Sequence, residues 1–271
     1  MVVFPNCKIN LGLNILQKRE DGFHDLETFF FPLPWSDALE IISPQDKTSL
    51  ATTGLSLGPN ENNLCLKAYY LLKKDFHSIP EIKMHLHKAI PAGAGLGGGS
   101  ADAAFALQLL NKKFNLAISE RKLKNYALQL GSDCPFFLIN KPCLASGRGE
   151  ILERIPLSLS GYKILLINPG LHIGTANAFN GIKPLIPKKR IKEIIQKPVE
   201  HWREELRNDF EKNVFEKHPE LKKIKSDLYE KEALYASMSG TGSTVFGIFL
   251  KDHTLKISLR PGYIFKEIII P

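Results

Sequence analysis

Apolar and polar residues alternate in two stretches of the chain, residues 8–16 and 82–87. A period of two is typical of a β-strand with one face turned toward a core. In the first stretch the isoleucines and leucines at odd positions point one way, whereas Lys8 and Asn10 point the other. Both an ordinary solvent-facing edge strand and a pair of functional side chains are consistent with this arrangement.

Further segments complete an α+β pattern, because several short strands precede the first helices. We expect further strands at residues 26–31, 37–42, 162–168, 234–239, 244–250 and 263–270, and helices at residues 64–75, 100–113 and 120–130. A basic helical region without glycine follows at residues 187–231, and Pro32 and Pro34 separate the first two of these strands.

Helix ends and one turn are marked by single residues. Side chains that accept hydrogen bonds from a first helical turn are suitable N-caps, and a glycine often follows the last turn. The expected N-caps are Asn62 or Asn63 for the helix at residues 64–75 and Ser119 for the helix at residues 120–130, which Gly131 is expected to end. Asp21-Gly22 predicts a hairpin turn that also contains His24.

Residues 91–101, Pro-Ala-Gly-Ala-Gly-Leu-Gly-Gly-Gly-Ser-Ala, join the second alternating strand to a helix. Five glycines within seven residues leave backbone N–H groups uncovered and permit positive φ. Together with the positive end of the following helix dipole, these N–H groups are suited to bind an anion such as phosphate.

The glycine-rich segment at residues 91–101 differs from a Walker A loop, a Rossmann motif and a flexible linker. No Gly-Lys-Ser/Thr closes it, which excludes a Walker A loop. Gly93, Gly95 and Gly98 satisfy G-x-G-x-x-G, but the preceding strand alternates and Pro91 intervenes, unlike a Rossmann motif. A flexible linker is a weaker interpretation, because linkers seldom continue directly into a helix rich in alanine and leucine.

Asp133 is a single carboxylate between the end of a helix and the apolar run Pro135-Phe136-Phe137. An N-cap with proline in the next first turn is the commoner meaning of such an aspartate. A general base at a helix N-terminus is the functional interpretation, and the two do not exclude each other.

The composition limits the class of protein. A chain of 271 residues with 44% hydrophobic and 24% charged residues is long enough for one large or two ordinary globular domains. Neither a membrane span nor a signal peptide is expected, and four scattered cysteines indicate reduced thiols in a cytoplasmic protein without a metal site. The formal charge of +8 is consistent with nucleic-acid binding, but solvated helix faces explain most of it.

Taken with its flanks, the segment 91–104 resembles the ATP-binding motif of the GHMP kinases. Residues 5–13 and 21–29 resemble the opening of the 4-diphosphocytidyl-2-C-methyl-D-erythritol kinase family within that superfamily. Leu130–Phe137 resembles its L-G-A-D-V-P-F-F motif, and Asn208–Glu211, Pro219–Leu221 and Met238–Gly247 resemble its C-terminal half. The resemblance covers essentially the whole chain.

This resemblance implies ATP-dependent phosphorylation of the 2-hydroxyl of 4-diphosphocytidyl-2-C-methyl-D-erythritol, a step of the non-mevalonate isoprenoid pathway. It assigns Lys8 and Asp133 as catalytic residues, the second as the base, and Asn10 as a ligand of the substrate polyol. The residues that it assigns to ATP are Pro91, Ala92, Gly93, Ala94, Gly95, Leu96, Gly97, Gly98, Gly99, Ser100 and Ala101, with Lys88 and Asn63 near the adenine.

For the cytidine, the resemblance assigns His24 to the edge of the cytosine and Phe23 and Phe179 to stacking. Phe23 replaces a frequent tyrosine, and Gly174, five residues before Phe179, replaces a frequent proline. Cys7, Ala94 and Cys134 are further departures from the family pattern. We expect Mg²⁺ to arrive with ATP and to be held mainly by phosphates, because no carboxylate is an obvious ligand.

The implied fold is a two-domain GHMP kinase, with a ribosomal-protein-S5-like domain at residues 1–158 and a ferredoxin-like domain at residues 159–271. We expect a monomer or weak homodimer that binds neither nucleic acid nor a membrane. The alternatives left open are a GHMP kinase for another alcohol, such as homoserine or mevalonate, and a basic nucleic-acid-binding module.

Overall fold

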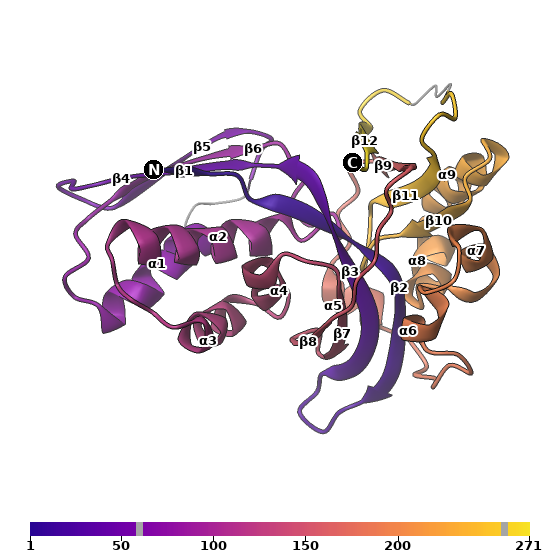
Figure 1. The fold of residues 1–271 in the computed structure, drawn as a ribbon, viewed down its shortest axis with the longest axis horizontal. Helices are drawn as coiled ribbons and strands as arrows, with labels where there is room; N and C mark the ends of the chain where they lie inside the picture. The colour runs from indigo at the N-terminus through magenta and orange to yellow at the C-terminus, as the bar shows by residue number, and fades with distance from the viewer. Residues whose placement is uncertain (58–61, 256–259) are drawn as a thin grey trace. The chain divides into compact units, whose positions relative to one another are not determined.

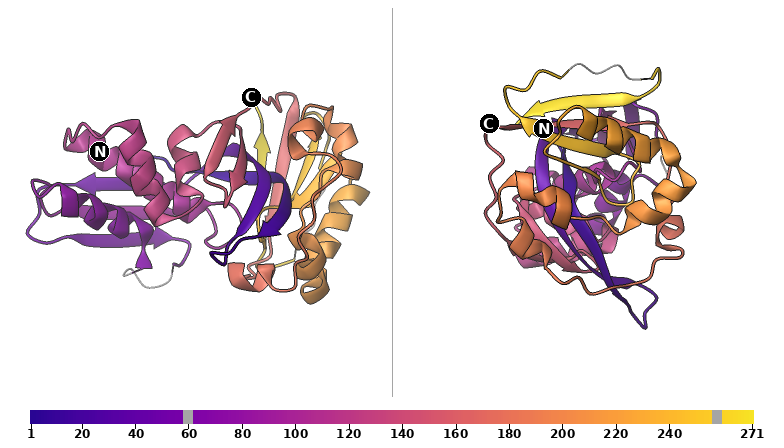
Figure 2. Two further views of the ribbon diagram at one scale, coloured as in Figure 1. Left: turned by 90° about the horizontal axis from the view of Figure 1, so that it is seen from below. Right: turned by 90° about the vertical axis from the view of Figure 1, so that its right-hand side faces the viewer.

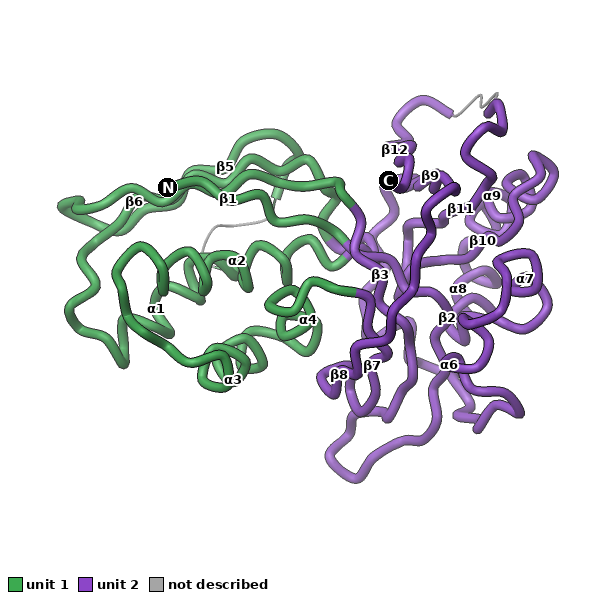
Figure 3. Tube along the Cα trace, in the orientation of Figure 1, with its two compact units in different colours: residues 1–7, 34–92, 97–141 green, residues 8–33, 93–96, 142–271 purple. Residues whose placement is uncertain are grey.

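A computed structural model of the chain describes residues 1–57, 62–255 and 260–271. It divides into two compact units (Figure 3). Unit 1 comprises residues 1–7, 34–92 and 97–141, and unit 2 comprises residues 8–33, 93–96 and 142–271. The units interleave along the sequence, and both contain part of the glycine-rich loop. No single cut separates them, and the division at residue 158 stays a prediction.

Unit 1 is a four-stranded sheet with helices on one side (Figures 1 and 2). The strand order is β1 (Val2–Val3), β4 (Ala38–Ile42), β6 (Lys83–Lys88) and β5 (Ser49–Gly54). The helices are α1 (Leu64–Asp75), α2 (Gly98–Lys113), α3 (Glu120–Leu130) and α4 (Cys134–Ile139). Strand β6 runs antiparallel to β4 and parallel to β5.

The core of unit 1 follows from the alternation in β6. Met84 and Leu86 are fully buried and belong to the same cluster as Leu72 of α1 and Leu107 of α2. Lys83, at the start of the strand, is exposed on the opposite side. The prediction of a half-buried strand before the glycine-rich loop is therefore confirmed.

Unit 2 contains most of one four-stranded sheet and all of another. The first has the order β2 (Asn6–Lys18), β3 (His24–Ser36), β7 (Cys143–Gly147) and β8 (Ile151–Arg154), and the second has the order β10 (Tyr235–Met238), β11 (Val245–Leu250), β9 (Tyr162–Asn168) and β12 (Ile264–Ile269). The helical elements are α5 (Thr175–Phe179), α6 (Ile191–Ile194), the 3₁₀ turn η2 (Val199–His201), α7 (Trp202–Glu205), α8 (Phe210–Lys217) and α9 (Pro219–Glu230). Helices α8 and α9 and the inner side of the second sheet share one apolar core.

Strand β2 is covered along the side on which β3 does not pair. The N–H of Leu13 donates to the carbonyl of Arg207 at 2.8 Å, and the N–H of Asp209 donates to the carbonyl of Leu13 at 2.9 Å. Lys8 and Asn10, nearer the start of the strand, are only 3% and 2% exposed. The interpretation of residues 8–16 as a solvent-facing edge strand is wrong, because residues 8–15 are buried although β2 is the end strand of its sheet.

The long helices and most strands agree with the sequence. The N-caps are Asn63, whose side chain accepts from Cys65 N–H at 2.9 Å, and Ser119, whose side chain accepts from Lys122 N–H at 3.4 Å. Gly131 ends α3. Helix α2 begins two residues earlier than expected, at Gly98.

Two expectations about element boundaries are corrected. Strand β3 continues through Pro32 and Pro34. Its pairing with β7 ends at Phe30, so no N–H beyond that residue is needed on the β7 side. His24 begins β3 and does not lie in the turn.

Candidate functional site

The side chain of Lys8 is held by two oxygen atoms inside unit 2. Its Nζ donates to Asn10 Oδ1 at 2.5 Å and to the carbonyl oxygen of Gly95 at 3.3 Å. The same Nζ lies 4.9 Å from the centroid of the Phe30 ring. A cation held at a fixed point in a buried environment can stabilise negative charge that develops in a transition state.

Asn10 is oriented by a second chain of hydrogen bonds. Its Nδ2 donates to Thr28 Oγ1 at 2.9 Å, and that hydroxyl donates to the carbonyl of Gly12 at 2.6 Å. Because the amide nitrogen faces Thr28, the amide oxygen faces Lys8. β2 and β3 thus fix the direction of both side chains that the sequence placed on one face.

Ser239 connects this strand to the glycine-rich loop. Its hydroxyl donates to the carbonyl of Gly95 at 2.7 Å and accepts from the N–H of Asn10 at 3.1 Å. Ser239 is fully buried. A Cβ atom on Gly95 would lie 2.0 Å from the carbonyl oxygen of Ser239, so only glycine permits this close approach.

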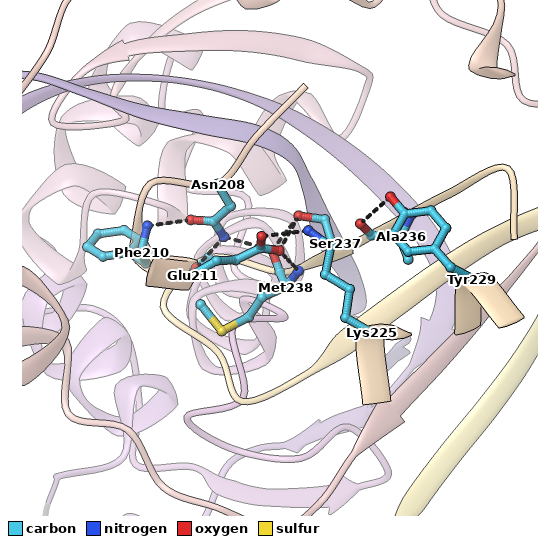
Figure 4. A network of polar contacts seen from close by, with 9 residues as sticks. Asn208, Phe210, Glu211, Lys225, Tyr229, Ala236, Ser237 and Met238 are labelled. Carbon is cyan, nitrogen blue, oxygen red and sulfur yellow. Dashed lines mark hydrogen bonds and ion pairs between the residues drawn. The ribbon is translucent and has the colours of Figure 1, made fainter. Parts of the chain in front are cut away.

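A polar network supports the segment around Ser239 (Figure 4). Asn208 Nδ2 donates to the carbonyls of Met238 and Gly240 at 2.7 and 2.8 Å. Glu211 accepts from the N–H of Met238 at 2.8 Å and is paired with Lys225 at 2.6 Å. The segment that contacts Gly95 is therefore itself held in place from α8 and the residues before it.

The loop has the conformation that its composition predicts. Gly93, Gly95 and Gly97 have φ of +62°, +77° and +69°, a region that favours glycine. The carbonyls of Ala94 and Leu96 accept from the N–H groups of Thr244 and Lys8. The apolar side chains of Ala94 and Leu96 are buried, whereas Gly93 and Gly99 are exposed.

Lys88 lies in a buried ion cluster of unit 1. Its Nζ donates to Asp102 Oδ2 at 2.7 Å and also pairs closely with Asp37. The side chains of Lys88 and Asp37 are 1% and 0% exposed. The ammonium therefore has a structural role within unit 1, and its expected place near the adenine stays a prediction.

Asp133 and Asn63 also belong to unit 1. Asp133 occupies the N-cap position of α4 without a side-chain capping hydrogen bond, and Pro135 lies in the first turn. The carboxamide of Asn63 caps α1, which the sequence predicted alongside a contact with adenine. Catalytic and nucleotide-binding roles for these two residues stay predictions.

Three aromatic residues were predicted to hold cytidine, and all lie in unit 2. The rings of His24 and Phe179 stack on each other, with centroids 4.7 Å apart and an interplanar angle of 19°. Phe23 is 49% exposed, and the Arg148 guanidinium lies 4.2 Å from its ring centroid. Desolvation and the charge of Lys18 lower the pKa of His24, which favours the neutral ring.

Comparison with known proteins supplies the family. The model of the GHMP kinases N terminal domain matches residues 63–141, and the model of the GHMP kinases C terminal domain matches residues 185–258. A 4-diphosphocytidyl-2-C-methyl-D-erythritol kinase of Bacteroides fragilis is 49% identical over 271 residues, covering 98% of both chains. The chain belongs to the GHMP kinases, in the family of the 4-diphosphocytidyl-2-C-methyl-D-erythritol kinases.

Further relatives agree with this assignment. The Bacteroides thetaiotaomicron kinase of the same name is 53% identical over 259 residues, covering 94% of both chains. A crystal structure of 4-(cytidine 5'-diphospho)-2C-methyl-D-erythritol kinase matches with a TM-score of 0.79 and 30% identity, over 93% of this chain and 90% of that one. Methanococcus jannaschii mevalonate kinase, 16% identical with a TM-score of 0.65 over 93% of this chain and 92% of its own, shares the fold.

This GHMP kinase is a small-molecule kinase with the two-domain α+β fold expected from its sequence. Within residues 1–57, 62–255 and 260–271, no group of three or more histidine, cysteine, aspartate and glutamate side chains could hold a metal ion. No helix in the same part of the chain is long and apolar enough to cross a bilayer.

Sequence reasoning did not assign roles to Ser239, Asn208 and Asp102. The first two lie in stretches that resemble the family, Met238–Gly247 and Asn208–Glu211, so a signal was present. The role of Ser239 depends on its contact with Gly95, which lies 144 residues away in sequence. No local pattern encodes a contact at that distance. Asp102 resembles an ordinary helical aspartate until its burial is known.

Proposed function

We propose that this kinase transfers the γ-phosphate of ATP to the 2-hydroxyl of 4-diphosphocytidyl-2-C-methyl-D-erythritol. The hydroxyl oxygen forms a bond to the γ-phosphorus, and the bond from that phosphorus to the β,γ-bridging oxygen breaks. ADP leaves with the electron pair, and Asp133 accepts the hydroxyl proton. Little covalent chemistry falls to the protein, because phosphoryl transfer depends mainly on positioning and charge stabilisation.

The observation that best supports this reaction is the contact between Lys8 and the glycine-rich loop. The Lys8 ammonium donates to the carbonyl of Gly95, so a buried cation is fixed to the backbone that is suited to phosphate binding. We assign Lys8 to stabilising charge on the transferring phosphoryl group and the acceptor oxygen. Asn10, bound to the same ammonium, is the proposed ligand of the polyol.

The proposed ligands of the cytidine are Phe23, His24 and Phe179. A largely neutral His24 has both a donor and an acceptor nitrogen for the edge of the cytosine. The exposed ring of Phe23 offers a face for stacking. Because the rings of His24 and Phe179 already stack, a base between them would have to separate the two side chains.

ATP is the proposed phosphate donor, with its triphosphate at residues 91–101. Mg²⁺ is proposed to enter with ATP and to be held mainly by phosphate oxygens. We further propose that the enzyme acts in the cytoplasm as a monomer or weak homodimer.

The test is turnover of a panel of alcohols. Purified protein with Mg-ATP should phosphorylate the cytidylyl polyol, and ³¹P NMR should place the new phosphate on the 2-hydroxyl. Asp133→Asn should lower kcat at least about 10²-fold, because general-base catalysis contributes that much, while a fluorescent ATP analogue still binds. Asp46→Asn, an exposed change of the same kind in unit 1, is the matched control.

Two results would contradict the proposal. Turnover of homoserine or mevalonate without turnover of the cytidylyl polyol would assign another alcohol to the site. Nearly full activity in Asp133→Asn would remove the proton-accepting role from this carboxylate.

A further inference from the structure

The two ends of the glycine-rich loop that belong to unit 1 meet one buried cluster of charges. At the entry, Asp37 Oδ1 accepts from the N–H groups of Ala89 and Ile90 at 2.7 and 2.9 Å. At the exit, a Cβ on Gly98 would lie 3.4 Å from Lys88 Nζ and 3.1 Å from Ile90. The start of α2 therefore packs directly on the lysine that Asp37 holds.

Asp102 completes the cluster from α2. Its Oδ2 accepts from Lys88 Nζ at 2.7 Å, and the residue is 4% exposed. Its Oδ1 is buried and has no hydrogen-bond partner among the described residues. The cluster thus spans the loop, from the backbone before Pro91 to the second turn of α2.

The charges of this cluster do not balance. Two carboxylates face one ammonium, which leaves a net charge of −1 when all three groups are ionised. A buried net charge is costly, and one proton removes it. Asp37 has two backbone donors besides Lys88, whereas Asp102 Oδ1 has none in the described chain, so Asp102 is the better site for the proton.

The other groups around Asp102 keep one charge state near neutral pH. Burial lowers the pKa of Lys88, but the charges of Asp102 and Asp37 outweigh it and raise the value, so the ammonium persists. Burial raises the pKa of Cys65, on α1, and raises that of Cys134, on α4, to about 12, so both thiols stay neutral. Burial and Asp37 raise the pKa of Asp102 to about 7, against the opposing charge of Lys88.

We propose that Asp37, Lys88 and Asp102 form a positioning cluster for the nucleotide, in which proton uptake by Asp102 strengthens the hold of the glycine-rich loop on a triphosphate. The inference rests on the proposed use of ATP. Asp102 does not touch the nucleotide; it acts through Lys88 and the first turns of α2.

The coupling is electrostatic. The N-terminal end of α2 attracts negative charge, and an ionised Asp102 in its second turn competes with a phosphate for that attraction. Neutralising Asp102 removes the competitor. Linkage then requires the reverse effect as well, so binding of a triphosphate should raise the affinity of Asp102 for its proton.

The experiment measures the dissociation constant of the β,γ-imido analogue of ATP between pH 6 and pH 8. The ratio of the wild-type constant to that of Asp102→Asn cancels the titration of the ligand itself. The ratio should be near one at pH 6 and should rise to about fivefold at pH 8, with the variant binding more tightly. Asp46→Asn, which removes an exposed carboxylate of unit 1, should give no such rise.

Calorimetry of the unaltered protein provides a second measurement that needs no variant. Near pH 7.5, binding of the analogue in buffers of different ionisation enthalpy should show proton uptake beyond that of the ligand. A ratio of dissociation constants that stays constant from pH 6 to pH 8, or the absence of proton uptake, would overturn the proposed role of the cluster. Neither result would contradict the proposed use of ATP. Absence of binding at every pH would overturn the use of ATP, and this inference with it.

Discussion

The glycine-rich loop is supported in unit 1 by a buried cluster with one excess carboxylate, and in unit 2 by a hydroxyl, a close backbone contact and the Lys8 ammonium. In unit 1, Asp37, Lys88 and Asp102 hold its ends through a buried ion cluster. In unit 2, its middle residues are held by the hydroxyl of Ser239 and by a backbone contact at Gly95 that leaves no room for a side chain. The same loop therefore depends on ionisation at its ends and on shape in its middle.

Because of this difference, pH should change the support of the loop in unit 1 more than its support in unit 2. The raised pKa of Asp102 means that the folded chain holds this proton more tightly than the unfolded chain. The contribution of Asp102 to stability is therefore fully present below about pH 4 and declines as pH rises toward about 7. The hydroxyl and amide groups of Ser239 and Asn208 do not titrate in this range, so the support that these two side chains give in unit 2 should not vary with pH.

The largest expected effect comes from removing the cation of the charged support. Lys88→Met leaves two buried carboxylates without a counter-charge, and the free energy of unfolding should fall by about 3–5 kcal/mol at pH 8. Protonation relieves part of this loss, so the deficit should be smaller at pH 5. Denaturant unfolding at both pH values measures it, with Lys74→Met, an exposed change on α1, as the control.

Asn208→Ala is the comparison for unit 2 in the same experiment. It leaves the buried carbonyls of Met238 and Gly240 without their donor and should cost about 2 kcal/mol at either pH. If the losses of Lys88→Met and Asn208→Ala depended on pH in the same way, the distinction between the two supports would be lost.

The next effect concerns shape alone. In Gly95→Ala the new Cβ would lie 2.0 Å from a backbone oxygen of Ser239, and neither backbone segment can yield easily. We expect kcat/KM to fall about 10²-fold, because a displacement of about 1 Å in a reacting site has consequences of that size. Steady-state kinetics measures this loss.

Gly161→Ala separates the close contact from the conformation. Gly161 has φ of +88°, similar to Gly95. Apart from Gly161 and its two chain neighbours, no heavy atom of the described residues lies within 4 Å of the position that a Cβ would occupy. The substitution should lower stability by about 1 kcal/mol through its backbone conformation and leave kcat/KM within about twofold. Equal losses of activity in both variants would mean that backbone strain, and not the contact with Ser239, matters at Gly95.

The parts of the fold that sequence predicted are those that local chemistry determines. The alternation in β6, the caps at Asn63 and Ser119 and the glycines of the loop each act over a few residues, and each prediction is confirmed. The covering of β2 by residues 207–209 was missed because it joins segments about 190 residues apart, and pairing at that distance has no local signature.

In the candidate site, too, local features could be predicted from the sequence and contacts between distant residues could not. The shared face of Lys8 and Asn10 followed from the period of a strand, and the structure shows their hydrogen bond. The partners of Lys88 could not be read from the sequence, because Asp37 and Asp102 lie 51 and 14 residues away and reach it only in the folded unit. Resemblance to a family assigned roles to residues but could not give their contacts.

The smallest expected effect tests whether the support in unit 2 tolerates the loss of one hydrogen bond. Ser239→Ala removes a donor to the carbonyl of Gly95, which keeps Lys8 Nζ as a second donor. A typical hydrogen bond contributes about 1 kcal/mol, so kcat/KM should fall about fivefold, equally from pH 6 to pH 8. Ser160→Ala, at an exposed serine of the same unit, is the control. A loss that grew with pH would mean that a titrating group acts through Ser239, and the support in unit 2 would then share the behaviour of the ion cluster.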